Sequence, residues 1–351
     1  MNAAWRVGRA LDATVTLGTR LGLSGLLPDN TKVHVPLLRC LRMCLAFALA
    51  LPGLVAAQAQ TNVEGAVQPA APLSREERLA LMQQTRFEAV EFDSLATTGI
   101  SGKRIPIRGY LARAKQHGGP GAVLNPACEG LMQKGGEEIK VKYRRMASFL
   151  WSHGITVLLV DGFNPRGYEE SCSRRERNSI SRLQDALGAL AYLRLRGDVN
   201  VDKIFTVTWG GTGGIEGMNR DSPHLEQPGA GFLAAVMYYP DCRIDDRVFA
   251  PYAPIQVFVG EKDAWNPASR CQKLAQRQAA GSAAFDVKIY PDTYHSFDQP
   301  FGEPKMNAFN PKLGMVGRNA KSTEDSYRMI GAFLLKVIKG QAATVLPPAG
   351  S

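Results

Sequence analysis

The chain has 351 residues, of which 45% are hydrophobic and 21% are charged, so it is long enough for one large α/β domain with a sizeable core. Its formal charge of +10 would suit a nucleic-acid-binding protein, but the basic residues are scattered and their densest group, residues 140–145, is short. Because no basic face interleaved with aromatic residues is visible, we expect no nucleic-acid partner.

The first 59 residues do not resemble a folded domain. Residues 37–43 carry two arginines, residues 44–57 form an apolar run, and Ala57-Gln58-Ala59 is an A-x-A cleavage site. This order predicts a leader with a secretory signal peptide over residues 1–59, and hence a periplasmic or secreted protein. The apolar run is short and contains Pro52, so we expect no stable membrane insertion after cleavage.

A long segment precedes this signal. Signals normally begin close to the start of translation, so we expect the true start near Val33 or Val35. The alternative is an amphipathic leader that is not cleaved. Residues 60–77 are polar and rich in alanine and proline, which predicts a linker. The folded domain is expected over residues 78–340, with residues 341–351 as a C-terminal tail.

Cysteine usage agrees with export. Cleavage would remove Cys40 and Cys44. Four cysteines would remain, namely Cys128, Cys172, Cys242 and Cys271. An even number in an exported chain favours disulfides, with three possible pairings. Chain order favours the first with the second and the third with the fourth, and four unpaired buried cysteines are the alternative. No metal or organic cofactor is expected, because no Cys-x-x-Cys or histidine-rich spacing suggests zinc.

The domain begins with two strands and then alternates strands with helices. Residues 87–95 alternate apolar and polar side chains, and residues 104–112 are predicted as their antiparallel partner. The later predicted strands are 122–125, 156–161, 204–209, 232–239, 255–260 and 286–290, and the predicted helices are 143–153, 180–196, 268–280 and 324–339. This alternation predicts a mostly parallel sheet with helices on both faces.

The segment IFTVTWGGTGG, residues 204–214, is the centre of the functional prediction. A buried strand that runs into clustered glycines is typical of a nucleophile elbow, in which the residues two before and two after the nucleophile are small. Gly210, Thr212 and Gly214 fit this spacing, and Thr212 is therefore the candidate nucleophile. A threonine is unusual there, because a β-branched residue tolerates positive φ poorly and its hydroxyl is hindered.

A candidate acid and base follow the elbow. Asp263 comes after a predicted strand, and His295 lies in the loop YPDTYHSF after a later strand. A turn with a nucleophile, then an acid, then a histidine is the order of the α/β-hydrolases. The alternatives are that His295 is a surface residue, that Asp263 caps the next helix, although Asn266 is better placed as N-cap, or that Glu261 replaces Asp263.

Two more segments belong to the predicted site. Ala127 and Cys128 follow the first buried strand, where a backbone N–H commonly contributes to an oxyanion hole, and Gly213 would supply the second N–H. Trp209 precedes the elbow and is a candidate substrate contact. Glu129 is unexpected in this loop, because a carboxylate opposes a developing oxyanion unless it points away or pairs with Arg166.

Residues 87–339 resemble the dienelactone hydrolase family of α/β-hydrolases, especially its exported members. The segments that carry the resemblance are IPIRGYLAR, PACEGL, VLLVDGFNPRGYEESC, LQDALGALAYL, VFVGEKDAWNPASRC and YPDTYHSFD. The resemblance implies an α/β-hydrolase fold and hydrolysis of an ester or lactone through a covalent acyl-enzyme, with Asp263 as the acid and His295 as the base.

The sequence departs from this family at the nucleophile. Family members carry Cys or Ser in a turn of the form G-[WF]-[SC]-x-G-G. Alignment on Trp209 puts Gly210 at the nucleophile, whereas a shift of two residues puts Thr212 there. The first loop departs too, with Pro126-Ala127 where a His-Gly pair is common.

The sequence is compatible with two functions. The first is hydrolysis of a small ester or lactone, by Thr212, by an unrecognised nucleophile, or by water that His295 and Asp263 activate directly. The second is a catalytically impaired homologue that binds a small molecule in the same pocket. The acid and the histidine favour the first function, and the missing serine or cysteine favours the second.

Overall fold

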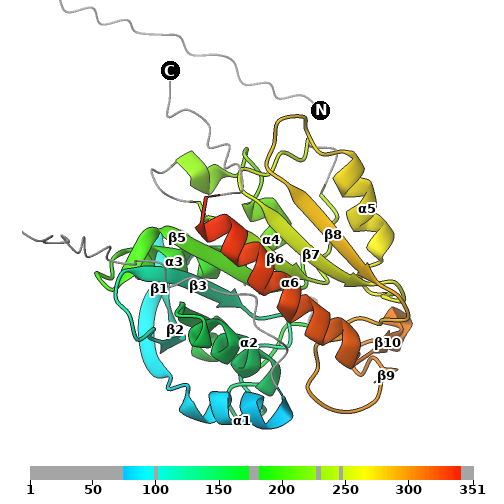
Figure 1. Ribbon diagram of the computed structural model, residues 1–351, viewed down its shortest axis with the longest axis horizontal. Coiled ribbons are helices and arrows are strands. Elements are labelled where there is room, and N and C mark those ends of the chain that lie inside the picture. The colour runs from blue at the N-terminus through cyan, green and yellow to red at the C-terminus, as the bar shows by residue number, and fades with distance from the viewer. Residues whose placement is uncertain (1–73, 99–101, 174–181, 227–230, 245–247, 341–351) are drawn as a thin grey trace, which may run out of the picture. The chain divides into compact units, whose positions relative to one another are not determined.

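The computed structural model describes residues 74–98, 102–173, 182–226, 231–244 and 248–340 (Figure 1). All of them belong to one compact unit, Thr61–Ser351. The predicted leader, signal peptide and C-terminal tail lie outside the described residues. Within the described part, no helix combines the length and apolarity that a membrane span requires.

One eight-stranded sheet organises this unit, in the order β1-β2-β4-β3-β5-β6-β7-β8. The strands are β1 (Glu88–Thr98), β2 (Lys103–Ala112), β3 (Gly119–Asn125), β4 (Thr156–Asp161), β5 (Val199–Trp209), β6 (Ala235–Tyr238), β7 (Ile255–Gly260) and β8 (Phe285–Tyr290). Strand β2 pairs antiparallel with β1 and β4, and the pairs from β4 to β8 are parallel. The predicted α/β-hydrolase fold is confirmed.

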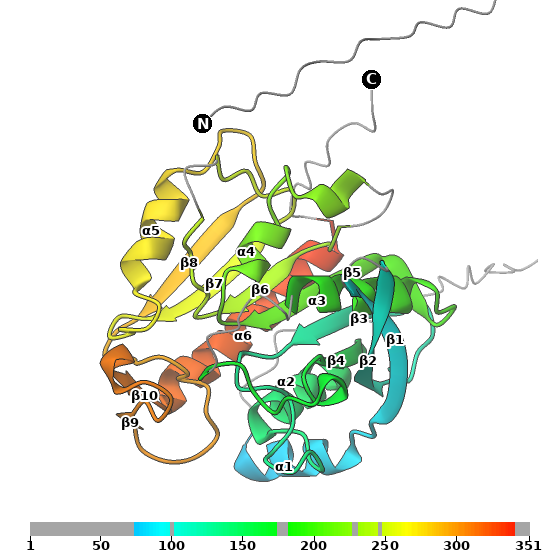
Figure 2. The ribbon, with the colours of Figure 1, turned by 180° about the vertical axis from the view of Figure 1, so that it is seen from behind.

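Helices cover both faces of the sheet. They are α1 (Arg75–Gln84), α2 (Val141–Ser152), α3 (Arg182–Arg194), α4 (Gly213–Gly217), α5 (Ala268–Gln276) and α6 (Ala320–Ile338), with 3-10 turns η1 (Asn164–Arg166), η2 (Pro223–Glu226) and η3 (Pro311–Leu313). Helices α2 and α6 lie in front of the sheet in Figure 1, and α3, α4 and α5 lie in front in the opposite view of Figure 2. A small hairpin pairs β9 (Lys305–Met306) with β10 (Met315–Val316).

Two apolar cores follow from this layering. One core holds the buried side chains of α3, α4 and α5, and the other holds those of α2 and α6. Strand β5 serves both, because Ile204 belongs to the first core while Phe205 and Val207 belong to the second. Strands β4 and β7 are buried along their whole length, as expected for central parallel strands, and their bounds match the prediction.

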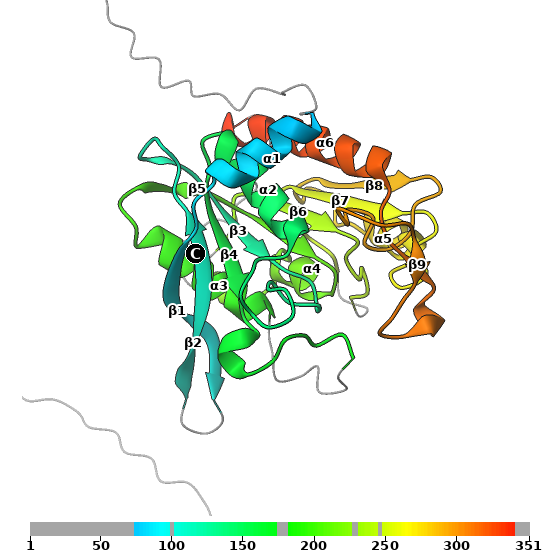
Figure 3. The same ribbon diagram turned by 90° about the horizontal axis from the view of Figure 1, so that it is seen from below.

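Helix α1 was not predicted, and α6 begins earlier than the predicted residue 324; a cap sets the start of each. Ser74 and Glu77 form a reciprocal capping box, so α1 begins inside the predicted linker and lies beside α2 (Figure 3). Asn319 accepts a hydrogen bond from the backbone N–H of Ser322, at 3.1 Å, and α6 therefore starts at Ala320.

The predicted disulfide pairing is confirmed. Cys128 is bonded to Cys172, and Cys242 is bonded to Cys271. The first bridge joins the loop after β3 to the segment after η1, and the second joins the loop after β6 to α5. Each therefore ties together segments that follow parallel strands, on the side of the sheet where ligands bind in open α/β folds.

Two helical glycines provide a test of this packing. A Cβ on Gly188 of α3 would lie 2.2 Å from the carbonyl oxygen of Asp93 in β1, whereas a Cβ on Gly331 of α6 would meet only Phe149, at 3.9 Å. We expect Gly188→Ala to lower the free energy of unfolding by roughly 1–3 kcal/mol through overpacking. Gly331→Ala should raise it by up to about 1 kcal/mol, because alanine is the better helix former. Urea denaturation of both variants measures this, and a shift in the same direction would contradict the packing.

Candidate active site

His295 and Asp263 form a buried pair. His295 Nδ1 lies 2.7 Å from Asp263 Oδ2, and the side chains are 6% and 0% exposed. A carboxylate can only accept, so Nδ1 is the donor, which leaves Nε2 as the basic nitrogen. The other carboxylate oxygen, Oδ1, accepts the backbone N–H groups of Trp265 and Asn266 at 2.9 and 2.8 Å. The structure thus brings together two residues of the predicted site, and Asp263 rather than Glu261 contacts His295.

A close approach of two loops makes this pair possible. Gly260 ends β7, and a Cβ there would lie 2.1 Å from the carbonyl oxygen of Thr293. Only a glycine lets the loop after β8 pass this close to the end of β7. The Thr293 carbonyl oxygen also accepts the N–H of Lys262, at 2.9 Å, so the segments that carry Asp263 and His295 are held together by backbone contacts.

Backbone strain in the described part of the chain gathers around His295. The described part of the chain has three non-glycine residues with positive φ, namely Tyr239 (38°), Asp292 (51°) and Ser296 (55°). Asp292 and Ser296 flank His295 in the same loop, and the Tyr239 ring lies 4.4 Å from the imidazole. Trp265 stacks on the imidazole at 4.8 Å. Strained residues of this kind cluster at functional sites, and two aromatic rings pack against the imidazole and restrict its orientation.

The sharp turn after β5 is centred on Gly210. Gly210 and Gly211 have φ values of 59° and 74°. Thr212 has φ −88° and ψ −27° and precedes the short helix α4. Thr212 therefore does not occupy the centre of the elbow, as had been expected. The left-handed backbone conformation at the centre belongs to Gly210, which is the residue that alignment on Trp209 puts at the nucleophile position. Thr212 still lines the adjoining cavity.

Arg182 holds the elbow in place. Its guanidinium donates to the carbonyl oxygens of Pro126, Trp209 and Gly210 at 2.8, 2.9 and 3.1 Å. A Cβ on Gly211 would lie 1.9 Å from this guanidinium, which explains the second glycine of the turn. Burial lowers the pKa of Arg182. The loop after β3 and the elbow thus share one arginine as their cross-link.

A cavity of about 500 Å³ opens over the elbow. Its walls include the glycines of the turn, Thr212, Trp265, Asn266 and the Cys128–Cys172 disulfide. Four charged side chains also contribute, namely Arg182, Glu216, Asp241 and Arg243. In volume the cavity falls within the range of small-molecule sites. In the described part of the chain, no group of three or more His, Cys, Asp or Glu side chains is placed to hold a metal ion.

The predicted oxyanion-hole residues differ in their environments. The N–H of Ala127 donates to the hydroxyl of Tyr143, at 2.9 Å, and is therefore engaged within the protein. Cys128 and Gly213 line the cavity. Among the described residues, the N–H groups of Cys128 and Gly211 have no hydrogen-bond acceptor. Gly211, and not Gly213, directly follows the centre of the turn at Gly210.

Trp209 is not a wall of the cavity. Its side chain is fully buried, and its indole Nε1 donates to Asp298 Oδ2 at 2.7 Å. Tyr239 donates its hydroxyl to the other oxygen of Asp298, at 2.8 Å. The prediction of Trp209 as a substrate contact is therefore wrong, and its role is to anchor the end of β5 to the segment that follows His295.

A buried ammonium continues this network, and nothing in the sequence had indicated it. Lys142 is 3% exposed. Its Nζ lies 2.5 Å from Glu129 Oε1 and 3.2 Å from the Tyr239 hydroxyl, to which it donates. Burial alone would raise the pKa of Glu129, but the charge and hydrogen bond of Lys142 outweigh it, so that pKa is lowered. Glu129 thus pairs with Lys142 and not with Arg166, which pairs instead with Asp185 at 2.8 Å.

Comparison with known proteins agrees with this geometry. Residues 165–338 match the family model described as "Dienelactone hydrolase family". The matched segment contains the elbow, Asp263 and His295, so the resemblance inferred from the sequence is confirmed over this part of the chain. No curated protein sequence matches the chain.

Three solved structures illustrate what the chain is similar to. A Klebsiella pneumoniae protein named for the dienelactone hydrolases has 16% identity and a TM-score of 0.47, with 70% of this chain and 98% of that chain covered. Esterase LipW from Mycobacterium marinum has 14% identity and a TM-score of 0.48, with 75% and 86% covered. Esterase 2 from Thermogutta terrifontis has 13% identity and a TM-score of 0.49, with 75% and 97% covered.

Lys142 provides a test of the buried network. We expect Lys142→Met to lower the free energy of unfolding by roughly 3–5 kcal/mol, because Glu129 is left without its cation. In the wild type, ionised Glu129 stabilises the folded state, and this stabilisation is fully present above the pKa that Glu129 has in the unfolded chain. It is lost as the pH falls through the lower pKa of Glu129 in the folded protein. In the variant, burial raises that pKa with only Lys140 and Tyr143 left to oppose it, so the pKa is higher than in the wild type and protonation of Glu129 favours folding.

The stability difference between wild type and Lys142→Met should therefore be larger near pH 8 than near pH 5. Urea denaturation at both pH values measures it. Glu129→Gln combined with Lys142→Met serves as the control, because the uncompensated charge is then absent and most of the pH dependence should vanish. A difference that is the same at both pH values would contradict an ionised Glu129.

Proposed function

We propose that this protein hydrolyses a small ester or lactone, with His295 as the base and Asp263 as the residue that orients it. The observation that carries the proposal is the 2.7 Å contact between His295 Nδ1 and Asp263 Oδ2. It leaves Nε2 available to take a proton from a nucleophile. The cavity over the neighbouring elbow supplies the space for a small substrate.

The group that is attacked is the acyl carbonyl of the substrate. The N–H groups of Cys128 and Gly211 are suited to stabilise the oxyanion that forms on its oxygen. Two nucleophiles fit the site. One is the hydroxyl of Thr212, which would give a covalent acyl-enzyme. The other is a water molecule in the space above Gly210, where a Cβ would meet no atom within 4 Å.

Gly210 also favours a second function. A glycine at the left-handed centre of the elbow provides no side-chain nucleophile. A descendant that has lost covalent catalysis would use the same cavity to bind a small molecule without converting it. The retained pair of His295 and Asp263 argues for hydrolysis, because binding alone does not need a buried, oriented base.

We also infer that the protein acts in the periplasm or is secreted. Two disulfides are typical of an oxidising compartment. The cleavable leader predicted for residues 1–59 is the second support. A small-molecule substrate suits this location.

Hydrolysis of p-nitrophenyl esters by the mature chain tests the proposal. His295→Ala should lower kcat/KM by about 100-fold or more, because general-base catalysis is lost. Thr212→Ala separates the two nucleophiles. It should lower kcat by on the order of 1000-fold if Thr212 forms the acyl-enzyme, and by less than about tenfold if water attacks directly.

His153→Ala is the matched control, since this histidine lies at the end of α2 and packs against Phe149 rather than facing the cavity. It should leave kcat/KM unchanged. Hydrolysis that is insensitive to His295→Ala would remove the proposed base. Tight binding of an ester by a chain that never hydrolyses it would favour the second function.

Gly210→Ser should create or strongly increase ester hydrolysis. The backbone of Gly210 already has the left-handed φ of a nucleophile elbow, and the new Cβ meets no atom within 4 Å. The variant should lose roughly 1–3 kcal/mol of stability, because serine is strained at positive φ. Labelling of the introduced side chain by a fluorophosphonate, followed by mass spectrometry, reports whether its hydroxyl is activated. Gly211→Ser is the control and should fail, because its Cβ would collide with Arg182.

A further inference from the structure

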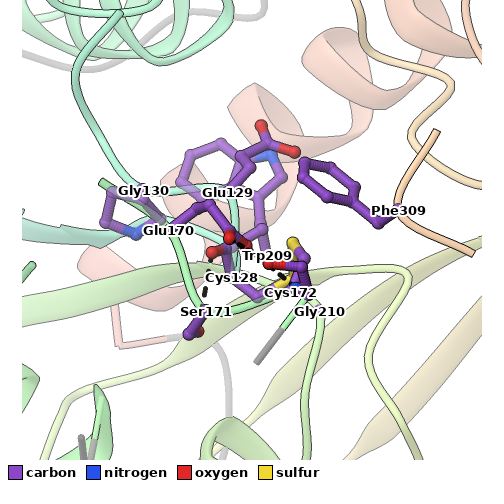
Figure 4. The surroundings of a disulfide bond; sticks show 12 residues. Cys128, Glu129, Gly130, Glu170, Ser171, Cys172, Trp209, Gly210 and Phe309 are labelled. Atoms are coloured by element: carbon purple, nitrogen blue, oxygen red, sulfur yellow. Dashed lines mark hydrogen bonds between the residues drawn. A yellow bond between two sulfur atoms is a disulfide. The ribbon is translucent and has the colours of Figure 1, made fainter. Parts of the chain in front are cut away.

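The two disulfides of the described chain differ in their exposure. Cys242 and Cys271 are 5% and 0% exposed. Cys128 and Cys172 are half-buried, and both line the cavity over the elbow. Figure 4 shows their bridge beside Trp209 and Gly210, at the place where the elbow lacks a side chain. A small reductant in the cavity can therefore reach the first bridge while the second stays shielded.

We propose that the Cys128–Cys172 disulfide is a masked nucleophile, and that its reduction converts the protein into a thiol-dependent acyl hydrolase. This inference rests on the proposed hydrolysis of esters and goes beyond it, because it supplies the nucleophile that Gly210 cannot. The oxidised protein then has only Thr212 or water for attack, and the reduced protein has a cysteine in the same cavity.

The structure keeps the cysteines near the cavity after reduction. The backbone N–H of Ser171 donates to the carbonyl oxygen of Cys128, at 2.7 Å. This hydrogen bond does not depend on the sulfur–sulfur bond, so the segments that carry the two cysteines stay joined when it breaks. Cys128 is held further by the carbonyl of Ala127, which accepts the N–H of Gly130 at 3.0 Å.

The charges around the cavity suit a reactive thiol. A nearby cation favours the thiolate, which is the reactive form of cysteine. Arg182 and Arg243 line the cavity as cations, and Glu216 and Asp241 line it as carboxylates. Asp241 is already paired with Arg243 at 2.5 Å and with Arg270 at 3.3 Å. The guanidinium of Arg182 donates to carbonyl oxygens, and no carboxylate of the described residues forms an ion pair with it.

The chemistry balances with a dithiol as the reductant. The dithiol gives two electrons and two protons to the bridge, becomes a disulfide itself, and leaves two protein thiols. One thiol releases its proton to the solvent in the cavity, where the guanidinium of Arg182 favours the thiolate. The sulfur then bonds to the acyl carbon, and the carbon–oxygen bond to the alcohol breaks as the alkoxide takes a proton from the solvent. Water then attacks the thioester, the carbon–sulfur bond breaks, and the carboxylic acid and the thiol are released.

Ester hydrolysis by two redox forms of the wild-type chain tests the inference. One sample is reduced with dithiothreitol and desalted under nitrogen, and the other stays oxidised. We expect kcat for p-nitrophenyl acetate to be at least about tenfold higher in the reduced form, because a thiolate is the stronger nucleophile. Mass spectrometry after rapid acid quenching should find an acetyl group on Cys128 or Cys172. Equal rates in the two forms, or acetylation that never reaches either cysteine, would overturn the inference.

Single variants identify the nucleophile. Cys128→Ser leaves Cys172 free and Cys172→Ser leaves Cys128 free, so one of them should hydrolyse the ester without reductant. The double variant should no longer respond to reductant. Iodoacetamide labelling of the mildly reduced wild type needs no variant, and it should modify Cys128 and Cys172 but not Cys242 or Cys271. Labelling of all four cysteines to the same extent would contradict selective reduction.

The outcomes also separate this inference from the proposed function. Hydrolysis by the oxidised chain that depends on His295 and does not change on reduction would support the hydrolase and reject the masked thiol. Absence of hydrolysis in both redox forms would reject both.

Discussion

The arrangement of the site depends on the contacts that the buried ammonium group of Lys142 makes. Its carboxylate partner Glu129 lies in the loop after β3, and its hydroxyl partner Tyr239 packs against His295. Tyr239 in turn donates to Asp298, which also binds the indole of Trp209. One cation therefore links the loop after β3, the surroundings of His295 and the end of β5. A charge this deeply buried is tolerated only because the polar groups around it are satisfied.

The same contacts explain why the sequence predicted part of the site and missed the rest. Asp263 and His295 could be found because chain order and position after a strand mark them, whatever the side-chain packing. Lys142 could not be found, because a lysine in the first turn of an amphipathic helix is usually solvated. Its burial follows from the fold, which brings Glu129 and Tyr239 to the same point.

The secondary structure, too, could be predicted from the sequence only in part. The bounds of β4 and β7 could be predicted because central parallel strands are continuous apolar runs. Helix α1 could not be predicted from composition, because alanine and proline upstream are typical of a linker while the Ser74–Glu77 capping box sets the start of the helix. The spacing of small residues favours Thr212 as the centre of the elbow, whereas the backbone turn at Gly210 is held by Arg182, which is distant in sequence.

Gly210 and Gly211 of the elbow are glycines for different structural reasons, and this difference bears on function. Gly211 has no room for a side chain, because the guanidinium of Arg182 occupies the position of its Cβ. Gly210 has room for one, and only its left-handed backbone favours glycine. The scaffold thus retains the conformation and the space of a nucleophile position while the side chain is missing. Gly210 itself therefore offers no nucleophile to the cavity. The side chains that line the cavity and carry a hydroxyl or sulfur atom beside this turn include Thr212 and the Cys128–Cys172 bridge.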